Sequence, residues 1–259
     1  MEKKFYSFKE IVESLPKKKN SRSSLWVKLV VRKISFVFTF LFVNIFISPW
    51  LASVISAIIA ILGSVFLCIN NDTFRILGVI FIQLWLVFDC VDGNIARVTK
   101  HFSKMGDFID TLSGYVISAF AMVGIGVAAY NTTSISFLKD NYLLVLFGCL
   151  GCIANLLTRL IHQNYVATIL KLESKGVVIH NPDEDVERDH GLGYLRSRID
   201  KEIGISGIFM PLLIIAAIFN FYDYFTIIYS IFFCLSCIAI ILYYILKSKP
   251  SSDEWGENK

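Results

Sequence analysis

The sequence predicts an all-α polytopic membrane protein, with an N-terminal amphipathic surface helix followed by six transmembrane helices. Of its 259 residues, 55% are hydrophobic and 18% are charged, and the mean hydropathy is +0.62. This balance is typical of an integral membrane protein. A transmembrane helix needs about 20 mainly apolar residues. Six such runs follow one another at 50–70, 74–92, 109–130, 141–163, 205–220 and 224–246.

A shorter apolar run at 34–48 precedes the first of these spans. It is short for a transmembrane helix and suits a helix that lies in the membrane interface. Lys and Arg residues mark the cytoplasmic side of a membrane protein. Six spans place all the basic clusters on that side, whereas a seventh span would place the lysines at 17–19 outside. We therefore expect residues 22–48 to form a helix at the cytoplasmic surface.

These runs divide the chain into three predicted parts. Residues 1–48 form a cytoplasmic basic segment and interfacial helix, residues 49–247 a six-helix membrane domain, and residues 248–259 a polar tail. The formal net charge of +4 comes mostly from the basic clusters that set the orientation. Nucleic acid binding is not expected, because no basic stripe is interleaved with exposed aromatic residues.

Two C-x-x-C pairs, Cys149/Cys152 and Cys234/Cys237, are present. A pair of such motifs can indicate a zinc site. Both lie inside apolar spans, where residues three apart share a face and small residues favour close helix packing. Packing is therefore the preferred interpretation.

Four aspartates stand out against this apolar background. Asp89 and Asp92 lie three apart near the end of the second predicted span, and Asp107 and Asp110 repeat that spacing at the start of the third. Residues three apart share one helix face, and the short turn at 97–105 makes the two helices antiparallel neighbours. An ionisable group in a membrane helix normally faces a partner, a cavity or a pathway. Ligands that are all oxygen favour a hard cation such as Mg²⁺ or Mn²⁺.

The residues beside the aspartates are small. Gly93, Ala96 and Gly106 would leave the acidic faces open to a ligand. Asp107 has a second explanation, because it lies in the first turn of its helix, where the helix dipole favours an acid without any function. The pattern predicts a small-walled, acidic pocket at the membrane surface that suits a ligand carrying phosphates.

Around these residues the sequence resembles the CDP-alcohol phosphatidyltransferase family. The family signature is D-x-x-D-G-x-x-A-R, a spacer, and then G-x-x-x-D-x-x-x-D. The first half is complete in DCVDGNIAR, which ends at Arg97, and GDFID, which begins at Gly106, supplies the third aspartate. The resemblance includes a surface helix followed by six spans and extends over most of residues 24–247.

The resemblance implies transfer of a substituted phosphate from a CDP-linked donor to a hydroxyl group, with release of CMP. It also implies two divalent ions, Mg²⁺ or Mn²⁺, which are held by Asp89, Asp92 and Asp110 and act as Lewis acids. Gly93 and Ala96 would let the nucleotide approach, and Arg97 would hold the carboxylates or a phosphate. A homodimer is implied by family analogy alone.

The chain departs from the family at the fourth aspartate, the family's proposed general base, because position 114 is Gly114. Three explanations are open. Asp107 acts as the base, which makes it a candidate catalytic residue together with Asp110. Alternatively, the acceptor needs no protein base and the glycine leaves room for a bulkier acceptor. Finally, the protein binds CDP-alcohols without turning them over. In a milder departure, Ser53 stands where members often have Thr, and it is a candidate nucleotide contact.

Arg159 and His162 lie three apart near the end of the fourth predicted span. With Arg196 and Arg198 of the long polar stretch at 164–204, they form a candidate phosphate site for the acceptor. The alternatives are side chains that snorkel to the interface and a solvated connector.

We expect CDP-diacylglycerol as the donor and a polar alcohol, phosphorylated or not, as the acceptor. The expected location is a prokaryotic plasma membrane, with the active site at the cytoplasmic face. The main alternative is a catalytically degenerate CDP-lipid-binding or scaffold protein. An ion transporter is weaker, because transport acids belong near the bilayer midplane.

Overall fold

The computed structural model describes residues 4–102, 105–139, 141–175, 199 and 201–248, and these ranges contain helices and no strand. Within them, five helices are long and apolar enough to cross a membrane: α4 (Pro49–Cys68), α5 (Asp72–Thr99), α6 (Gly106–Thr132), α7 (Leu143–Glu173) and α11 (Tyr222–Lys247). A shorter apolar helix, α10 (Phe209–Phe219), precedes α11. The N-terminal part contains α1 (Phe8–Glu13), α2 (Lys17–Arg22), the π-helix η1 (Val27–Val31) and α3 (Arg32–Asn44).

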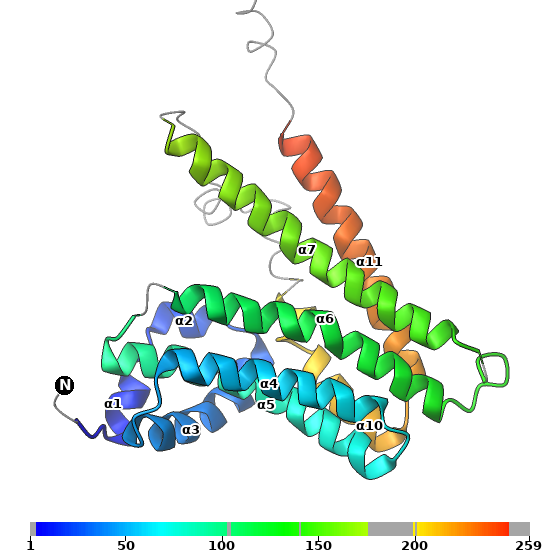
Figure 1. Ribbon diagram of the computed structural model, residues 1–259, viewed down its shortest axis with the longest axis horizontal. Helices are drawn as coiled ribbons and strands as arrows, with labels where there is room; N and C mark the ends of the chain where they lie inside the picture. Colours follow the sequence, from blue (N-terminus) through cyan, green and yellow to red (C-terminus); the bar gives the residue numbers. More distant parts are fainter. Residues whose placement is uncertain (1–3, 103–104, 140, 176–198, 200, 249–259) are drawn as a thin grey trace, which may run out of the picture.

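The long helices form two groups that meet at α6. Helix α4 packs against both α5 and α6, while α7 packs on α6 and pairs with α11. In Figure 1, α7 and α11 run side by side at an angle to α4, α5 and α6. Helix α3 packs on α5, and α10 lies between α5 and α11. This arrangement brings the end of α5, the beginnings of α4 and α6, and the N-terminal segment to one end of the bundle.

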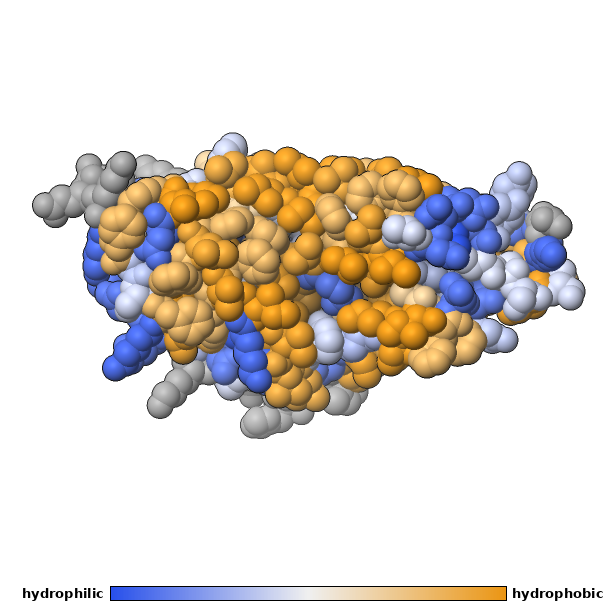
Figure 2. All heavy atoms as spheres, turned by 90° about the horizontal axis from the view of Figure 1, so that it is seen from below, coloured by the Kyte–Doolittle hydropathy of each residue, from blue (hydrophilic) through white to orange (hydrophobic). Residues whose placement is uncertain are grey.

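The outer surface is that of a membrane protein. Figure 2 shows a broad hydrophobic band across one face, with hydrophilic residues gathered toward its two ends. Large apolar side chains on α4 and α11 such as Ile58, Val65, Ile228 and Leu235 are more than half exposed. In water this exposure would be costly, whereas lipid tails accept it. The chain is thus an integral, multi-pass membrane protein, as its composition predicts.

The predicted helix over residues 22–48 is present as η1 and α3, and it ends earlier than expected. Helix α3 stops at Asn44, and Phe46 takes a left-handed conformation with φ of 63°. Helix α3 buries mainly polar side chains and exposes apolar ones. Arg32, Ser35, Thr39 and Val43 are buried, while apolar residues face outward: Ile34, Val37, Phe40 and Leu41. A polar inner face and an apolar outer face suit a helix that lies in a membrane interface.

The fifth predicted span, 205–220, is the one that the structure shortens. Helix α10 has 11 residues, about 16 Å at 1.5 Å per residue, which is too short to cross the roughly 30 Å hydrocarbon core alone. The chain turns before it, where Gly207 N–H donates to the carbonyl of Gly204 at 2.8 Å. Pro211 lies in the first turn of α10. The ring of a proline at this position prevents a regular helix from extending further toward the N-terminus. Hydropathy predicts the apolar run but does not reveal this interruption.

The C-x-x-C cysteines are free thiols within α7 and α11. Cys152 is buried, and its Sγ donates to the carbonyl of Ala119 on α6 at 2.7 Å. This contact fits the packing interpretation.

Glycines allow α4 and α5 to touch along their backbones. A Cβ built on Gly78 would lie 2.8 Å from the carbonyl oxygen of Gly63 and 2.8 Å from Leu67. Close approach at small residues is a main source of helix association in lipid, where apolar burial gives little advantage. These contacts hold the two helices that position the site in a fixed register.

Gly78→Leu is therefore expected to separate α4 from α5. Overpacking of this kind costs about 1–3 kcal/mol, so thermal unfolding of the purified protein in detergent should begin at a clearly lower temperature. Val65→Leu, on the lipid-facing side of α4 with 51% exposure, is the control and should leave the transition unchanged. Equal transitions for Gly78→Leu and the native chain would contradict the close packing.

Candidate active site

A cavity of about 270 Å³ opens at the end of the bundle where α5 ends and α6 begins. Its walls include the carboxylates of Asp89, Asp92 and Asp110. We call it the acidic cavity. The N-terminal segment also supplies lining residues, and Lys201 and Ser206, from the segment before α10, complete the lining.

The three aspartates are held in different ways. Asp92 is 5% exposed, and its carboxylate accepts hydrogen bonds from the Ser53 hydroxyl of α4 and from the Gly93 N–H. Asp89 on α5 and Asp110 on α6 line the same cavity from two different helices. None of the three forms an ion pair with a described residue. Three of the four predicted aspartates therefore come together in one cavity, and Asp107 is not among its lining residues.

The chemistry of these donors fits a hard divalent ion. Ionised carboxylates that share a cavity repel one another unless a cation lies nearby, and carboxylate oxygens are the ligands that Mg²⁺ and Mn²⁺ prefer. In the described part of the chain, no three acidic, His or Cys side chains lie close enough together to form a metal site as they stand. The carboxylate of Asp92 accepts a hydrogen bond from Ser53. Asp89, Asp92 and Asp110 are the residues that would hold the ions.

Arg97 is fixed by a chain of hydrogen bonds that runs to the surface helix. Its Nη2 donates to Oδ1 of Asn94 at 2.6 Å. Asn94 is fully buried and donates in turn to Ser35 and Thr39 of α3, at 3.2 Å each. A Cβ on Gly93 would lie 3.1 Å from Nη1 of Arg97. The glycine thus makes room for the guanidinium, and its predicted contact with the nucleotide stays a prediction.

Gly114 makes room for Arg159. A Cβ built on Gly114 would lie 2.7 Å from Nη1 of Arg159, so the guanidinium from α7 lies where a side chain at position 114 would begin. Arg159 is also close enough to Asp89 and Asp110 to act on them electrostatically. It forms no ion pair or hydrogen bond with another described residue. A cation therefore lies at the place where the family motif has a carboxylate.

The remaining predicted site residues lie outside the acidic cavity. Asp107 is exposed in the first turn of α6, and Ala96 and Gly106 are half-buried. His162 lies on α7, where its Nδ1 is 2.6 Å from the hydroxyl of Tyr244 on α11. Arg196 and Arg198 lie outside the described residues. The roles predicted for all of these stay predictions.

The structure adds residues that sequence reasoning missed. Below the aspartates, the hydroxyls of Ser56 and Ser113 are 2.6 Å apart, and the indole N–H of Trp85 donates to Ser113 at 3.0 Å. Lys19 and Arg32 also line the cavity. In the sequence, Arg32 is one of several basic residues that set orientation, and no local pattern distinguishes it from its neighbour Lys33. Only the packing of α3 on α5 assigns Arg32 to the cavity.

The fold and this site define a polytopic membrane protein with an acidic cavity, also lined by basic side chains, at one end of its helix bundle. Residues 30–178, more than half of the chain, match the CDP-alcohol phosphatidyltransferase family. The chain belongs to this family of transferases, which move phosphatidyl groups from CDP-alcohols, and the resemblance in its motif is confirmed. A search of the curated proteins found no match.

Proposed function

We propose that the protein is a metal-dependent transferase that moves a substituted phosphate from CDP-diacylglycerol to the hydroxyl of a polar, phosphorylated acceptor and releases CMP. One observation carries the proposal: Asp89, Asp92 and Asp110 line one cavity, without ion pairs to the described residues. Membership of the family supplies the reaction class.

Different residues of the chain would hold the ions, orient the carboxylates and bind phosphate. The bound ions, Mg²⁺ or Mn²⁺, would supply Lewis acidity to the phosphorus under attack. Ser53 and the Gly93 N–H orient the Asp92 carboxylate. Asn94 orients Arg97, which can bind a phosphate oxygen with its remaining donors. The serine and tryptophan layer below the aspartates closes the site toward the membrane interior.

Two observations support an acceptor that carries its own negative charge and needs no protein base at position 114. Asp107 is not among the residues that line the acidic cavity, and the guanidinium of Arg159 lies against Gly114. An arginine without an ion pair there suits an anionic acceptor, because a guanidinium binds phosphate through two parallel hydrogen bonds. Loss of a general base typically costs about 10²–10⁴-fold in rate, which slows a transferase without abolishing it.

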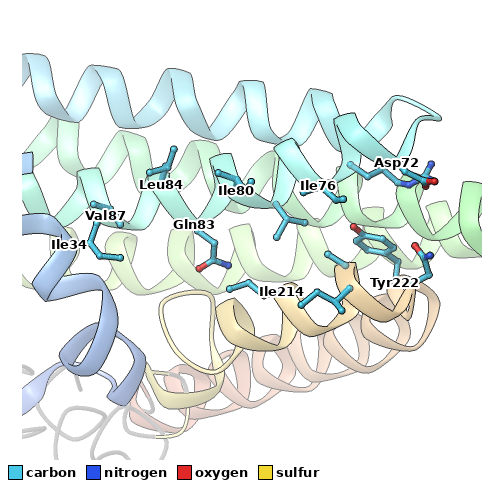
Figure 3. A pocket seen from close by; sticks show the side chains of 14 residues that line it. Ile34, Asp72, Ile76, Ile80, Gln83, Leu84, Val87, Ile214 and Tyr222 are labelled. Carbon is cyan, nitrogen blue, oxygen red and sulfur yellow. The ribbon is translucent and has the colours of Figure 1, made fainter.

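A long apolar groove supports a lipid as the donor. It has a volume of about 540 Å³ and runs between α5 and α10, from Ile34 at one end to Tyr222 and Asp72 at the other (Figure 3). Its lining includes Val87, whose neighbour Leu86 lines the acidic cavity. A donor with its pyrophosphate in the acidic cavity could therefore lay an acyl chain along this groove.

The proposal is tested by CMP release from the purified chain with two donors, CDP-diacylglycerol and a CDP-alcohol without acyl chains. Ala217→Trp fills the groove and is expected to slow release from the lipid donor about tenfold, since the displacement of two methylenes costs about 0.8 kcal/mol each. Ile215→Trp, 46% exposed on the same helix, is the control. A preference of the native chain for the soluble donor, or an equal loss with both donors, would remove the lipid assignment.

A second candidate function is a CDP-lipid-binding protein without turnover, which Gly114 favours because the expected base is missing. It predicts nucleotide binding with no CMP release for any acceptor. The end of the bundle with the acidic cavity is assigned to the cytoplasmic face on the distribution of Lys and Arg. The prokaryotic plasma membrane and the homodimer stay predictions.

A further inference from the structure

Basic side chains line the acidic cavity together with the aspartates: Lys19 of α2, Arg32 of α3 and Arg97 of α5. We call these three residues the basic wall. None of the three forms an ion pair with a carboxylate in the described part of the chain. Burial and the nearby guanidinium groups of Arg97 and Arg32 lower the pKa of the Lys19 ammonium. The cations are thus close enough to oppose one another.

Arg32 is the member of the basic wall that is hardest to explain as a surface residue. Its side chain is only 5% exposed. Its Nη2 donates to the Ser23 hydroxyl at 2.8 Å, while its buried Nε–H has no partner among the described residues. The same holds for the buried Nε–H of Arg97. A buried guanidinium with an unused donor is costly unless a hydrogen-bond acceptor satisfies it, so two such groups on one cavity indicate an anionic ligand.

The segment that carries Lys19 and Arg32 is tied to the rest of the site. The Ser24 hydroxyl donates to the carbonyl of Ser206 at 2.6 Å, and the backbone N–H of Leu25 donates to the carboxylate of Glu202 at 3.1 Å. Residues far apart in the sequence therefore close the cavity together. A ligand held by the basic wall would share a cavity of about 270 Å³ with the three aspartates.

We infer that Lys19 and Arg32, together with Arg97, form a phosphate-binding site, in which the N-terminal surface segment grips a phosphate group in the cavity that the aspartates line. The inference rests on the proposed function, and it assigns substrate binding to residues outside the family motif. The phosphate belongs either to the cytidine diphosphate donor or to a phosphorylated acceptor. In both cases the unused Nε–H groups and the ammonium supply the donors.

The test is ligand binding by the full chain in nanodiscs of zwitterionic lipid, measured by calorimetry with CDP, cytidine and glycerol phosphate. Arg32→Gln is expected to weaken binding of the phosphate-bearing probe about tenfold or more, with and without Mg²⁺, and to leave cytidine unchanged. Arg32→Lys should retain part of the affinity. Lys33→Gln, an exposed neighbour with the same change in charge, should bind like the native chain.

The outcomes separate the two proposals. A loss for CDP assigns the site to the donor, and a loss for glycerol phosphate alone assigns it to the acceptor. If Asp92→Asn weakens Mg²⁺-dependent CDP binding while Arg32→Gln and Lys19→Gln bind every probe like the native chain, the basic wall is refuted and the proposed function stands. If the native chain binds none of the phosphate probes, both fail. Lys19→Gln, at the exposed rim, gives an answer even if Arg32→Gln does not fold.

Discussion

Asp92→Asn is expected to reduce CMP release by at least about 100-fold, because a metal ion contributes several kcal/mol of charge stabilisation in such transfers. The amide has the shape of the carboxylate and can still accept a hydrogen bond from Ser53, so the contact between α4 and α5 is largely kept. What is lost is the negative charge that would hold the ion. Release should be measured over a range of Mg²⁺ and Mn²⁺ concentrations, since higher metal should restore part of the rate.

Asp223→Asn is the matched control for this experiment. Asp223 is also a buried aspartate, 4% exposed, and its carboxylate also accepts a hydrogen bond from a hydroxyl, that of Thr133 at 3.0 Å. It lies in the first turn of α11 and does not line the acidic cavity. Its replacement should lower stability without changing the metal dependence of CMP release. Equal losses in the two variants would show that the Asp92 effect is structural.

Gly114→Asp, which restores the family motif, is expected to lower activity by about tenfold or more. The new Cβ would lie 2.7 Å from Nη1 of Arg159, so the guanidinium must move and would then pair with the added carboxylate. A charge-assisted hydrogen bond is worth about 1.5–3 kcal/mol, and the acceptor would lose such a bond. The KM for a phosphorylated acceptor should rise more than kcat falls.

Two further variants identify the cause of that loss. Gly114→Ala adds bulk without charge and should have a smaller effect. Arg159→Gln should raise the same KM, and Gly114→Asp in that background should add little, because both changes remove one interaction. A gain in CMP release on Gly114→Asp would contradict this account. It would instead indicate a degenerate transferase that lacks only its general base.

The sequence predicts the fold and the acidic half of the site because both depend on local patterns. Runs of apolar residues mark the spans, and the spacing of Asp89, Asp92 and Asp110 places them on two facing helices. The interruption before α10 was missed, since Gly204 and Gly207 act through backbone geometry and not through hydropathy.

The basic half of the site could not be predicted in this way. Arg32 reaches the acidic cavity because α3 packs on α5 through Asn94, Ser35 and Thr39, and no spacing in the chain encodes that contact. The relation between Gly114 and Arg159 is similar. The sequence shows that the glycine departs from the motif. The side chain that occupies the space beside it, Arg159, lies on another helix, 45 positions further along the sequence.

The most direct test of the central claim is CMP release from CDP-diacylglycerol by the purified native chain, with a pool of polyols and polyol phosphates, before and after removal of divalent ions by EDTA. Release is expected to stop with EDTA, to return with Mg²⁺ or Mn²⁺ and to be lost in Asp92→Asn. A native chain that binds CDP-diacylglycerol, yet releases no CMP with any acceptor in the presence of either ion, would contradict it.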